Sequence, residues 1–364
     1  MSDRYRSGII GAGFIGGIHA HAVRVAGGVV TRVAVSSPQH AAAAADRLYA
    51  ENPANSAEEL ISADDVDIVH VCTPNSSHFG LADLAIRAGK HVICEKPLAT
   101  TTDHARKLVA AAADAGIVAA VPFVYRYYPT VREARARIVH DDPGTLRLLH
   151  GSYLQDWLAS SESTNWRMNP TLGGASRAFG DIGVHWCDLM EFTTGHRITR
   201  LTARMITAYA QRGQQDGTVP NGTEDGALVM FDTDRGASGS VVVSQVSIGR
   251  KNRLWFSFDS ATATYVFDQE TPDSLWIGGR IENHIIMRGP DTLTPSAARL
   301  AVLPTGHPQG YQDCFNAFIA DTYALIGGQT PDGHPTFRDG LRAAQLTAAV
   351  IESAGTQAWV DVPA

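Results

Sequence analysis

The chain has 364 residues, of which 44% are hydrophobic and 18% are charged, and it carries a formal net charge of −7. This composition is typical of folded globular proteins and disfavours extended disorder. A net negative chain has no electrostatic reason to bind nucleic acid or an anionic membrane surface. The longest apolar runs, such as 66–72, are too short to span a bilayer, and the sequence opens on a strand-like segment rather than a signal peptide. We therefore expect a cytoplasmic protein with no nucleic-acid or membrane partner.

The length exceeds that of one ordinary hydrophobic core, so two domains are expected. The four cysteines show no CxxC spacing, which argues against a zinc knuckle or a redox dithiol and favours reduced thiols with no bound metal. They are Cys72, Cys94, Cys187 and Cys314.

The first part of the chain alternates short apolar runs with alanine-rich stretches, a pattern typical of βαβ units around a parallel sheet. Strands are expected at 6–10, 31–35, 67–72, 91–94 and 118–123, and helices at 15–26, 39–51, 77–88 and 101–115. Residues 1–122 are therefore predicted to form a doubly wound α/β domain.

After residue 123 the strands become longer and more alternating, and turn residues separate them, which favours a mainly antiparallel sheet in an α+β domain over 123–364. Strands are expected at 146–153, 198–208, 226–232, 239–245, 252–257 and 263–267, and helices at 130–140, 183–193, 311–326 and 337–354. The stretches 211–222 and 289–309 look irregular, and 304–310 is a candidate lid or substrate loop.

A GxGxxG motif follows the first expected strand and opens the first expected helix, which is the context that a dinucleotide-binding fingerprint requires. Gly11 permits a tight turn, Gly13 lets the backbone approach a pyrophosphate, and Gly16 allows close packing of the helix on the sheet. The motif, which also contains Phe14 and Ile15, predicts a Rossmann domain that binds NAD or NADP.

The end of the second expected strand normally carries the acid that binds the adenosine ribose of NAD, about 20 residues beyond the glycines. This chain has Ser36 and Ser37 there, so the choice between NAD and NADP stays open. The loop at Thr73-Pro74-Asn75 could pass over the nicotinamide ribose. The full set of expected cofactor-binding residues is Gly11, Gly13, Phe14, Ile15, Gly16, Ser36, Ser37, Thr73, Pro74, Asn75, His78, Glu95, Lys96 and Pro97.

Two further motifs carry chemical side chains. Glu95-Lys96-Pro97 follows the strand at 91–94, so Lys96 should project from the carboxyl edge of the parallel sheet, although alone it would read as a surface lysine. Asp181 and His185 are four apart at the start of an expected helix and should share one face. In isolation, Asp181 could be a helix cap and His185 a packed core residue.

With these three motifs in this order, the chain resembles the glucose–fructose oxidoreductase, inositol dehydrogenase and rhizopine-catabolism family (Gfo/Idh/MocA) over essentially its whole length. The resemblance implies a Rossmann domain followed by a domain built on a large open sheet, and it places the family's catalytic lysine, aspartate and histidine on Lys96, Asp181 and His185. Segments 153–157, 165–167, 249–252 and 359–362 are similar to those of sugar and glycoside dehydrogenases in the family.

The resemblance implies hydride transfer between the nicotinamide and a secondary alcohol or ketone of a sugar, anhydrosugar, glycoside or inositol. His185 would act as the base on the hydroxyl proton, Asp181 would orient the substrate or the imidazole, and Lys96 would stabilise the developing alkoxide. A substrate pocket is expected from Tyr125, Arg126, Gln155, Trp157, Trp166, Arg167, Asp181 and His185.

Other interpretations remain open at this stage. Some relatives use a retained NAD for transient oxidation and elimination, which makes them glycosidases, and a non-catalytic nucleotide-binding regulator would need only the glycines. A metal site at His185, Cys187 and Asp188 is disfavoured because side chains two apart on a helix do not converge. A homodimer or homotetramer formed through the second domain's sheet is expected.

Overall fold

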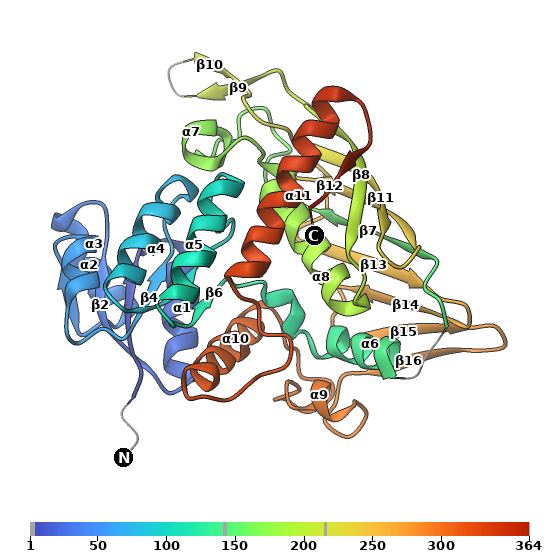
Figure 1. The fold of residues 1–364 in the computed structure, drawn as a ribbon, viewed down its shortest axis with the longest axis horizontal. Helices are drawn as coiled ribbons and strands as arrows, with labels where there is room; N and C mark the ends of the chain where they lie inside the picture. Colours follow the sequence, from blue (N-terminus) through green and yellow to red (C-terminus); the bar gives the residue numbers. More distant parts are fainter. Residues whose placement is uncertain (1–3, 141–143, 215–216, 364) are drawn as a thin grey trace. The chain divides into compact units, whose positions relative to one another are not determined.

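The computed structural model describes residues 4–140, 144–214 and 217–363. The chain forms two compact units (Figure 1), one of Met1–Val124 with Tyr311–Ala344 and the other of Tyr125–Gly310 with Gln345–Ala364. The sequence-based division kept all of 123–364 together, whereas the structure gives Tyr311–Ala344 to the first unit.

The first unit is built on a six-stranded sheet in the order β3-β2-β1-β4-β5-β6, and every pair of neighbours is parallel. Its strands are β1 (Arg6–Ile10), β2 (Val29–Ala34), β3 (Asn52–Ala54), β4 (Ile68–Val71), β5 (His91–Cys94) and β6 (Ala119–Ala120). The strand order reverses direction between β1 and β4, and in such sheets ligands bind at the carboxyl ends of the strands near this point. The predicted Rossmann topology is confirmed.

Helices flank this sheet, and several have caps that the sequence supplies. Ser56 accepts a hydrogen bond from the backbone N–H of Glu59 at the start of α3, and Thr101 does the same for His104 in α5. The helices are α1 (Phe14–Val25), α2 (Ala41–Leu48), α3 (Ala57–Ser62), α4 (His78–Arg87), α5 (Thr102–Asp114) and α10 (Tyr311–Ile326), with short 3₁₀ turns η1 (Pro38–His40) and η2 (Asn75–Ser77). Helix α11 (Phe337–Thr356) begins in this unit.

The helix predicted at 39–51 is too long. Tyr49 adopts a left-handed conformation with φ of 53°, so α2 ends at Leu48 and the chain turns into β3. The alanine run has a high helix propensity, but propensity does not locate this stop. Strand β3 and helix α3 were not predicted, because β3 is a three-residue edge strand that contains Pro53 and α3 has only six residues.

The second unit contains a nine-stranded sheet in the order β16-β15-β14-β13-β7-β12-β11-β8-β17, antiparallel except for the β7–β12 pair. Its strands are β7 (Leu148–Leu154), β8 (Ile198–Ile206), β11 (Gly226–Thr233), β12 (Ser238–Ser244), β13 (Arg253–Asp259), β14 (Ala263–Asp268), β15 (Ser274–Gly279), β16 (Asn283–Met287) and β17 (Val360–Asp361). The predicted large, mainly antiparallel sheet is confirmed.

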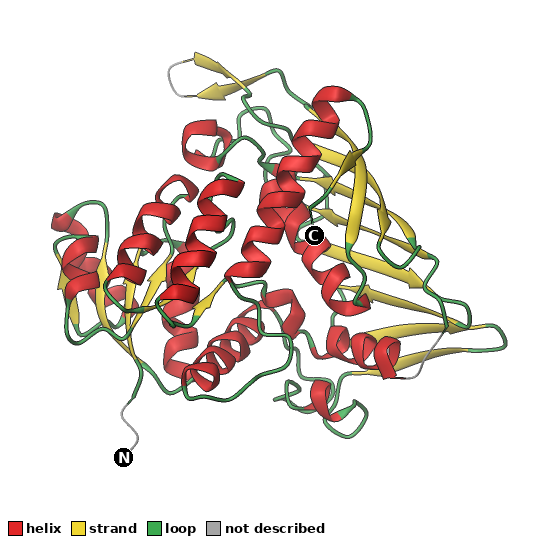
Figure 2. Cartoon of the chain, in the orientation of Figure 1, coloured by secondary structure: helices red, strands yellow, loops and turns green. Residues whose placement is uncertain are grey.

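Helices cover one face of this sheet (Figure 2), and the alternation of burial along the strands follows from that arrangement. Phe231 and Val243 are 1% exposed, whereas Leu228 and Met230 are 42% and 57% exposed. The helical elements are η3 (Val124–Tyr127), α6 (Pro129–His140), η4 (Trp166–Met168), α7 (Pro170–Gly173), η5 (Phe179–Gly183), α8 (Val184–Thr194), α9 (Pro295–Ala298) and the end of α11.

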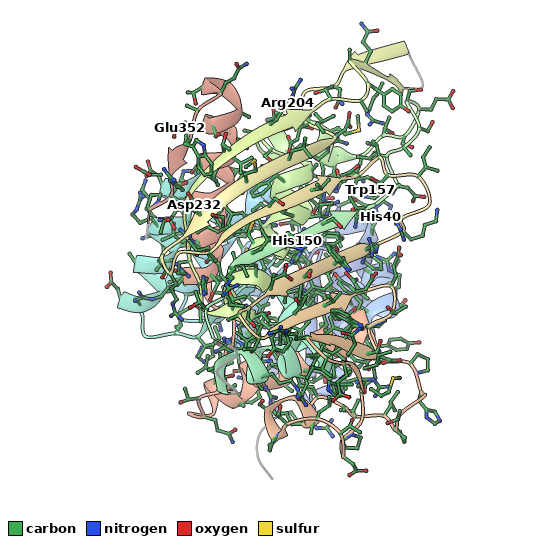
Figure 3. The ribbon with its side chains drawn as sticks, turned by 90° about the vertical axis from the view of Figure 1, so that its right-hand side faces the viewer. His40, His150, Trp157, Arg204, Asp232 and Glu352 are labelled. Carbon is green, nitrogen blue, oxygen red and sulfur yellow. The ribbon has the colours of Figure 1, made fainter. Side chains whose placement is uncertain are left out.

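Within the described ranges, no helix lies in front of the strands on the other face of the sheet (Figure 3), and His150, Arg204 and Asp232 project from this face. Two regions expected to be irregular contain structure: β9 (Gln211–Gln214) pairs with β10 (Gly217–Pro220), and α9 lies within 289–309. None of the helices in the described ranges combines the length and the hydropathy needed to cross a membrane.

Candidate functional site

The glycine-rich turn after β1 has the geometry of a phosphate cradle. Gly11 has φ of +98°, and a Cβ there would lie 2.5 Å from the carbonyl oxygen of Cys72. A Cβ on Gly16 would lie 2.1 Å from the carbonyl oxygen of Gly11, so both positions require glycine. Gly13, by contrast, is exposed and a Cβ there would meet nothing within 4 Å.

This open space lies at the N-terminus of α1, because Gly13 is the residue that precedes the helix. The first turn of α1 has no acidic side chain, so the partial positive charge of its free N–H groups is not offset. The guanidinium of Arg47 donates a hydrogen bond to the carbonyl of Ala12 and holds the turn in place. The turn therefore fits the pyrophosphate of a dinucleotide.

The position that selects between NAD and NADP lies just after β2. Ser36 is exposed, and the hydroxyl of Ser37 donates to Oε1 of Gln39 at 2.7 Å. Because no carboxylate stands at Ser36 or Ser37, neither residue would repel a 2′-phosphate.

The loops after β4 and β5 are tied together by His78. Its ring is fully buried, with Nδ1 2.7 Å from the carbonyl oxygen of Pro97 and Nε2 2.9 Å from that of Thr73. Burial is the largest influence on this ring, and it lowers the pKa of His78 although the two carbonyls oppose it. His78 thus holds the two predicted cofactor loops rather than presenting its ring to solvent.

Lys96 follows β5 and is half-buried, and the peptide bond to Pro97 is cis. Its backbone N–H donates to Oε2 of Glu95 at 3.2 Å. The other oxygen of Glu95 lies 3.1 Å from Nε2 of His19, which is fully buried in α1. The segment that carries Lys96 is therefore fixed from the interior of the first unit.

A chain of hydrogen bonds continues from His19 through the sheet. His19 Nδ1 lies 3.0 Å from His70 Nδ1, His70 Nε2 lies 3.1 Å from the hydroxyl of Ser7, and that hydroxyl lies 3.1 Å from the hydroxyl of Tyr323. Burial, and then the neighbouring His19, lowers the pKa of His70 well below its ordinary value. Burial raises the pKa of Tyr323 to about 12.

An ionised Glu95 can only accept hydrogen bonds, so with both imidazoles neutral it determines the direction of the whole chain. His19 must then donate from Nε2 and accept at Nδ1, and His70 must donate from Nδ1 and accept at Nε2. Ser7 in turn donates to His70 and accepts from Tyr323. One neutral tautomer of each histidine satisfies every group in the chain.

In the second unit, Asp181 and His185 lie on either side of the junction between η5 and α8. The five residues of η5 form a π-helical turn, a wider turn that is often found at functional sites. The buried carboxylate of Glu224 supports its start, because it accepts hydrogen bonds from the Ser176 hydroxyl at 2.7 Å and from the Phe179 N–H at 3.0 Å. Asp181 is partly exposed and His185 is 7% exposed.

Asp181 has polar partners at both carboxylate oxygens. Nε2 of Gln245 donates to Oδ2 at 2.9 Å, and Nε of Arg167 lies 3.4 Å from Oδ1. The guanidinium of Arg167 also lies over the ring of Trp166, 4.4 Å from its centroid. The structure thus brings Trp166, Arg167 and Asp181 together, as expected for residues of one site.

The ring of His185 packs edge-on against Tyr125, with centroids 4.8 Å apart. The hydroxyl of Tyr125 is hydrogen-bonded to that of Tyr153, which donates to Oδ1 of Asn252 at 2.7 Å. The same Oδ1 accepts from the side-chain amide of Gln155 at 2.8 Å, and the carbonyl oxygen of that amide accepts from the indole N–H of Trp157 at 2.8 Å. These contacts connect the predicted Tyr125, Gln155, Trp157 and His185 in one polar network.

Arg126 contacts an acidic residue of α8. Its guanidinium forms a two-point ion pair with Asp188, and both side chains are 8% exposed. Asp188 is therefore engaged by an arginine, and the described residues contain no group of three side chains that could hold a metal ion.

Several supporting residues were missed by sequence reasoning: His19, His70, Tyr153, Glu224, Gln245 and Asn252. Of these, Tyr153 and Asn252 lie in the segments 153–157 and 249–252 that resemble those of sugar dehydrogenases, and His19 lies three residues after Gly16 of the glycine motif. The others contact the motif residues only through the fold.

Two protein-family models match successive segments of the chain. A family model described as an oxidoreductase family with an NAD-binding Rossmann fold matches residues 5–123. A second model, described as the GFO/IDH/MocA C-terminal domain, matches residues 131–264.

Individual relatives match nearly the whole chain. Levoglucosan dehydrogenase of Pseudarthrobacter phenanthrenivorans is 31% identical over 98% of this chain and 97% of that protein. A solved structure of levoglucosan dehydrogenase with NADH and L-sorbose has a TM-score of 0.93 at 30% identity and covers 99% of both chains. An inositol dehydrogenase homologue from Azotobacter vinelandii with NAD⁺ has a TM-score of 0.87 at 25% identity, over 99% of this chain and 98% of that one.

Proposed function

We propose, from the premise that this chain belongs to the Gfo/Idh/MocA oxidoreductase family, that it oxidises a ring hydroxyl of a cyclic polyol with a nicotinamide cofactor. The substrate class comprises sugars, anhydrosugars, glycosides and inositols. The observation that carries the proposal is the turn at Gly11–Gly16, which leaves open space at Gly13 beside the N-terminus of α1. One relative is a levoglucosan dehydrogenase and another is a homologue of inositol dehydrogenase, which supports this class.

The cofactor, when bound, supplies the hydride acceptor, and we assign the remaining chemistry to three side chains. His185 accepts the proton of the reacting hydroxyl, since an imidazole can do so near neutral pH. Lys96 stabilises the negative charge that develops on that oxygen. Asp181 orients the substrate or the imidazole.

The polar network around His185 supports a sugar site in the second unit. Tyr125, Trp157 and Trp166 offer aromatic surface, and Gln155 and Arg167 offer donors for ring hydroxyls. Arg126 has a different role in this proposal, because its ion pair with Asp188 fixes η3 against α8. The remaining predicted cofactor contacts are the turn residues Gly11 to Gly16, Ser36, Ser37, and the loops that contain Thr73 to Asn75 and Glu95 to Pro97.

We also propose that the protein assembles as a homodimer or homotetramer through the helix-free face of its nine-stranded sheet. Exposed apolar side chains share this face with His150 and Asp232 by strand register and alternation, among them Leu148, Leu228, Met230 and Val242. A cytoplasmic location is proposed because all four cysteines are free thiols.

The proposal is tested by incubating the protein with NAD or NADP and each member of a panel of free sugars, inositols, anhydrosugars and glycosides. Reduction of the cofactor is followed by nicotinamide absorbance. We expect net reduction with at least one member of the panel, and the panel run with each cofactor also decides between NAD and NADP. Turnover of a glycoside with no net reduction would instead indicate a glycosidase that recycles bound NAD. Cofactor binding without any turnover would indicate a regulatory protein.

A further inference from the structure

We propose that Gln245 is a positioning residue that fixes the carboxylate of Asp181, and this inference rests on the role of Asp181 in the proposed function. Gln245 directly follows β12, and it is completely buried. Its side-chain Nε2 lies 2.9 Å from Oδ2 of Asp181, although the two residues are 64 positions apart in the chain.

The backbone of Gln245 is held on both sides. Its N–H donates to the carbonyl of Asp225 at 2.9 Å, and its own carbonyl accepts from the N–H of Leu158 at 3.1 Å. Asp225 is itself fully buried between Arg177 and Arg212, which both donate to Oδ1. The amide of Gln245 therefore projects from a rigid base.

The orientation of this amide follows from charge. A carboxylate only accepts hydrogen bonds, so Nε2 must face Asp181 and Oε1 must face away. In that orientation Oε1 is buried and has no hydrogen-bond partner among the described residues. An apolar side chain of similar size would avoid this unsatisfied oxygen, so the hydrogen bond to Asp181, rather than packing, accounts for a glutamine here.

The second contact to Asp181 is less constrained. Nε of Arg167 lies 3.4 Å from Oδ1, and the Arg167 side chain is 33% exposed. Compared with Arg167, the buried Gln245, which is attached on both sides, is the donor that restricts the rotation of the carboxylate more strongly. It also favours the ionised form of Asp181, because a hydrogen bond to a carboxylate stabilises its charge.

The test compares Gln245→Met, which keeps the volume but removes the donor, with Gln245→Glu, which can donate only when protonated. Gln269→Met is the matched control, since Gln269 follows β14 of the same sheet and its Oε1 is likewise buried without a hydrogen-bond partner among the described residues, but Gln269 is not one of the proposed site residues. Readouts are kcat and KM across pH, cofactor affinity, melting temperature, and the titration of the Asp181 carboxyl carbon by NMR.

We expect Gln245→Met to lower kcat about tenfold at every pH, in line with the loss of one hydrogen bond to a charged group, while cofactor affinity stays unchanged. In Gln245→Glu, the rate relative to the native protein should rise as the pH falls, because the introduced carboxyl group becomes protonated and can then donate. In both, the carboxyl carbon of Asp181 should titrate at a higher pH than in the native protein. Gln269→Met should leave kcat and the pH profile unchanged.

Native kcat values across pH and a native Asp181 titration in Gln245→Met would overturn the inference, as would equal losses of kcat in Gln245→Met and Gln269→Met. If the native protein reduces no cofactor with any substrate, the proposed function fails. The NMR titration still decides whether Gln245 controls Asp181 in that case.

Discussion

Gly11 and Gly13 are two residues apart, but glycine has a different role at each. At Gly11 the positive φ and the nearby Cys72 carbonyl exclude any side chain, so the fold itself needs glycine. At Gly13 the fold leaves open space, so only a ligand that approaches the backbone would need it.

This difference gives a paired prediction. Gly13→Ala should keep the native melting temperature and weaken cofactor binding by about tenfold or more, because the new methyl group occupies the pyrophosphate position. Gly11→Ala should lower the melting temperature, since a backbone strain of about 1 kcal/mol or more adds to the clash with Cys72. Calorimetry and titration of cofactor fluorescence measure the two effects. Native binding in Gly13→Ala would show that the open space is not the phosphate site.

Substitution of Lys96 should change the rate of the proposed reaction without changing the fold. Lys96→Ala should lower kcat by about 10²-fold or more, because it removes the charge that stabilises the alkoxide, while cofactor affinity stays near native. Lys107→Ala, at an exposed position of α5, is the matched control and should be fully active. Near-native turnover in Lys96→Ala would exclude this lysine from the site.

At the scale of secondary structure, α8 depends on the π-helical turn of η5 that precedes it. Glu224 accepts hydrogen bonds from a hydroxyl and two backbone N–H groups, those of Arg177 and Phe179, at the start of this turn. An ideal α-helix through Asp181 and His185 would rotate one relative to the other. The turn therefore contributes to the relative placement of the two proposed catalytic side chains.

Replacing the carboxylate of Glu224 with an amide tests the importance of the turn. Glu224→Gln should destabilise the second unit by about 2 kcal/mol, because one of the three buried donors loses its charged acceptor. All six tryptophans lie in this unit, so urea unfolding followed by tryptophan fluorescence reports on it directly. Glu282→Gln, at an exposed position, should change the stability by less than about 0.5 kcal/mol. Equal stability in the two variants would contradict this account.

The elements differ in how far the sequence predicts them. Helix α10 is found at the expected residues 311–326, because Gly310 precedes it and Gly327 and Gly328 follow it. Strands β15 and β16 were not expected, and β15 ends in two glycines, which have a low strand propensity. The motifs that contain Gly11, Lys96 and His185 consist of neighbouring residues, so they can be recognised without knowledge of tertiary contacts.

The supporting residues of the site could not be read in the same way. Gln245 and Asp181 are 64 residues apart, and His70 and His19 are 51 apart, so no local pattern connects them. Their roles arise only when strands β12 and β4 place them beside the motif residues. The irregular turn of η5 was also missed, because the sequence pattern of a π-helical turn is that of an ordinary helix start.

At the scale of the whole molecule, buried histidines make stability depend on pH. Burial lowers the pKa of His70, His78, His91 and His196 in the folded protein. Below about pH 6.5 the unfolded chain therefore binds protons that the native protein does not, and folding stability falls as the pH decreases. Above that pH the contribution is constant.

We expect the free energy of unfolding to fall between pH 7 and pH 5, by up to about 1.4 kcal/mol per pH unit for each fully buried ring. Urea titrations followed by far-ultraviolet circular dichroism measure this slope. His70→Asn should show a shallower slope than the native protein, and His40→Asn, at an exposed position, should not. A flat stability profile over this range would contradict the assignment of neutral buried rings.

The helix-free sheet face makes a prediction about assembly. The native protein should have a mass by light scattering that is a multiple of its 38.9 kDa chain mass. Met230→Asp places a charge at a 57% exposed apolar position on this face and should shift the mass to that of one chain. A native mass equal to one chain would refute the proposed dimer or tetramer.

The account's central claim is direct hydride transfer from a ring carbon of a cyclic polyol to the nicotinamide. It is tested most directly with an active substrate that carries deuterium at the reacting carbon, followed by mass spectrometry of the reduced cofactor. We predict that each reduced cofactor gains one deuterium and that the product is the corresponding ketone. Reduced cofactor without deuterium, or product formed with no net cofactor reduction, would contradict the claim.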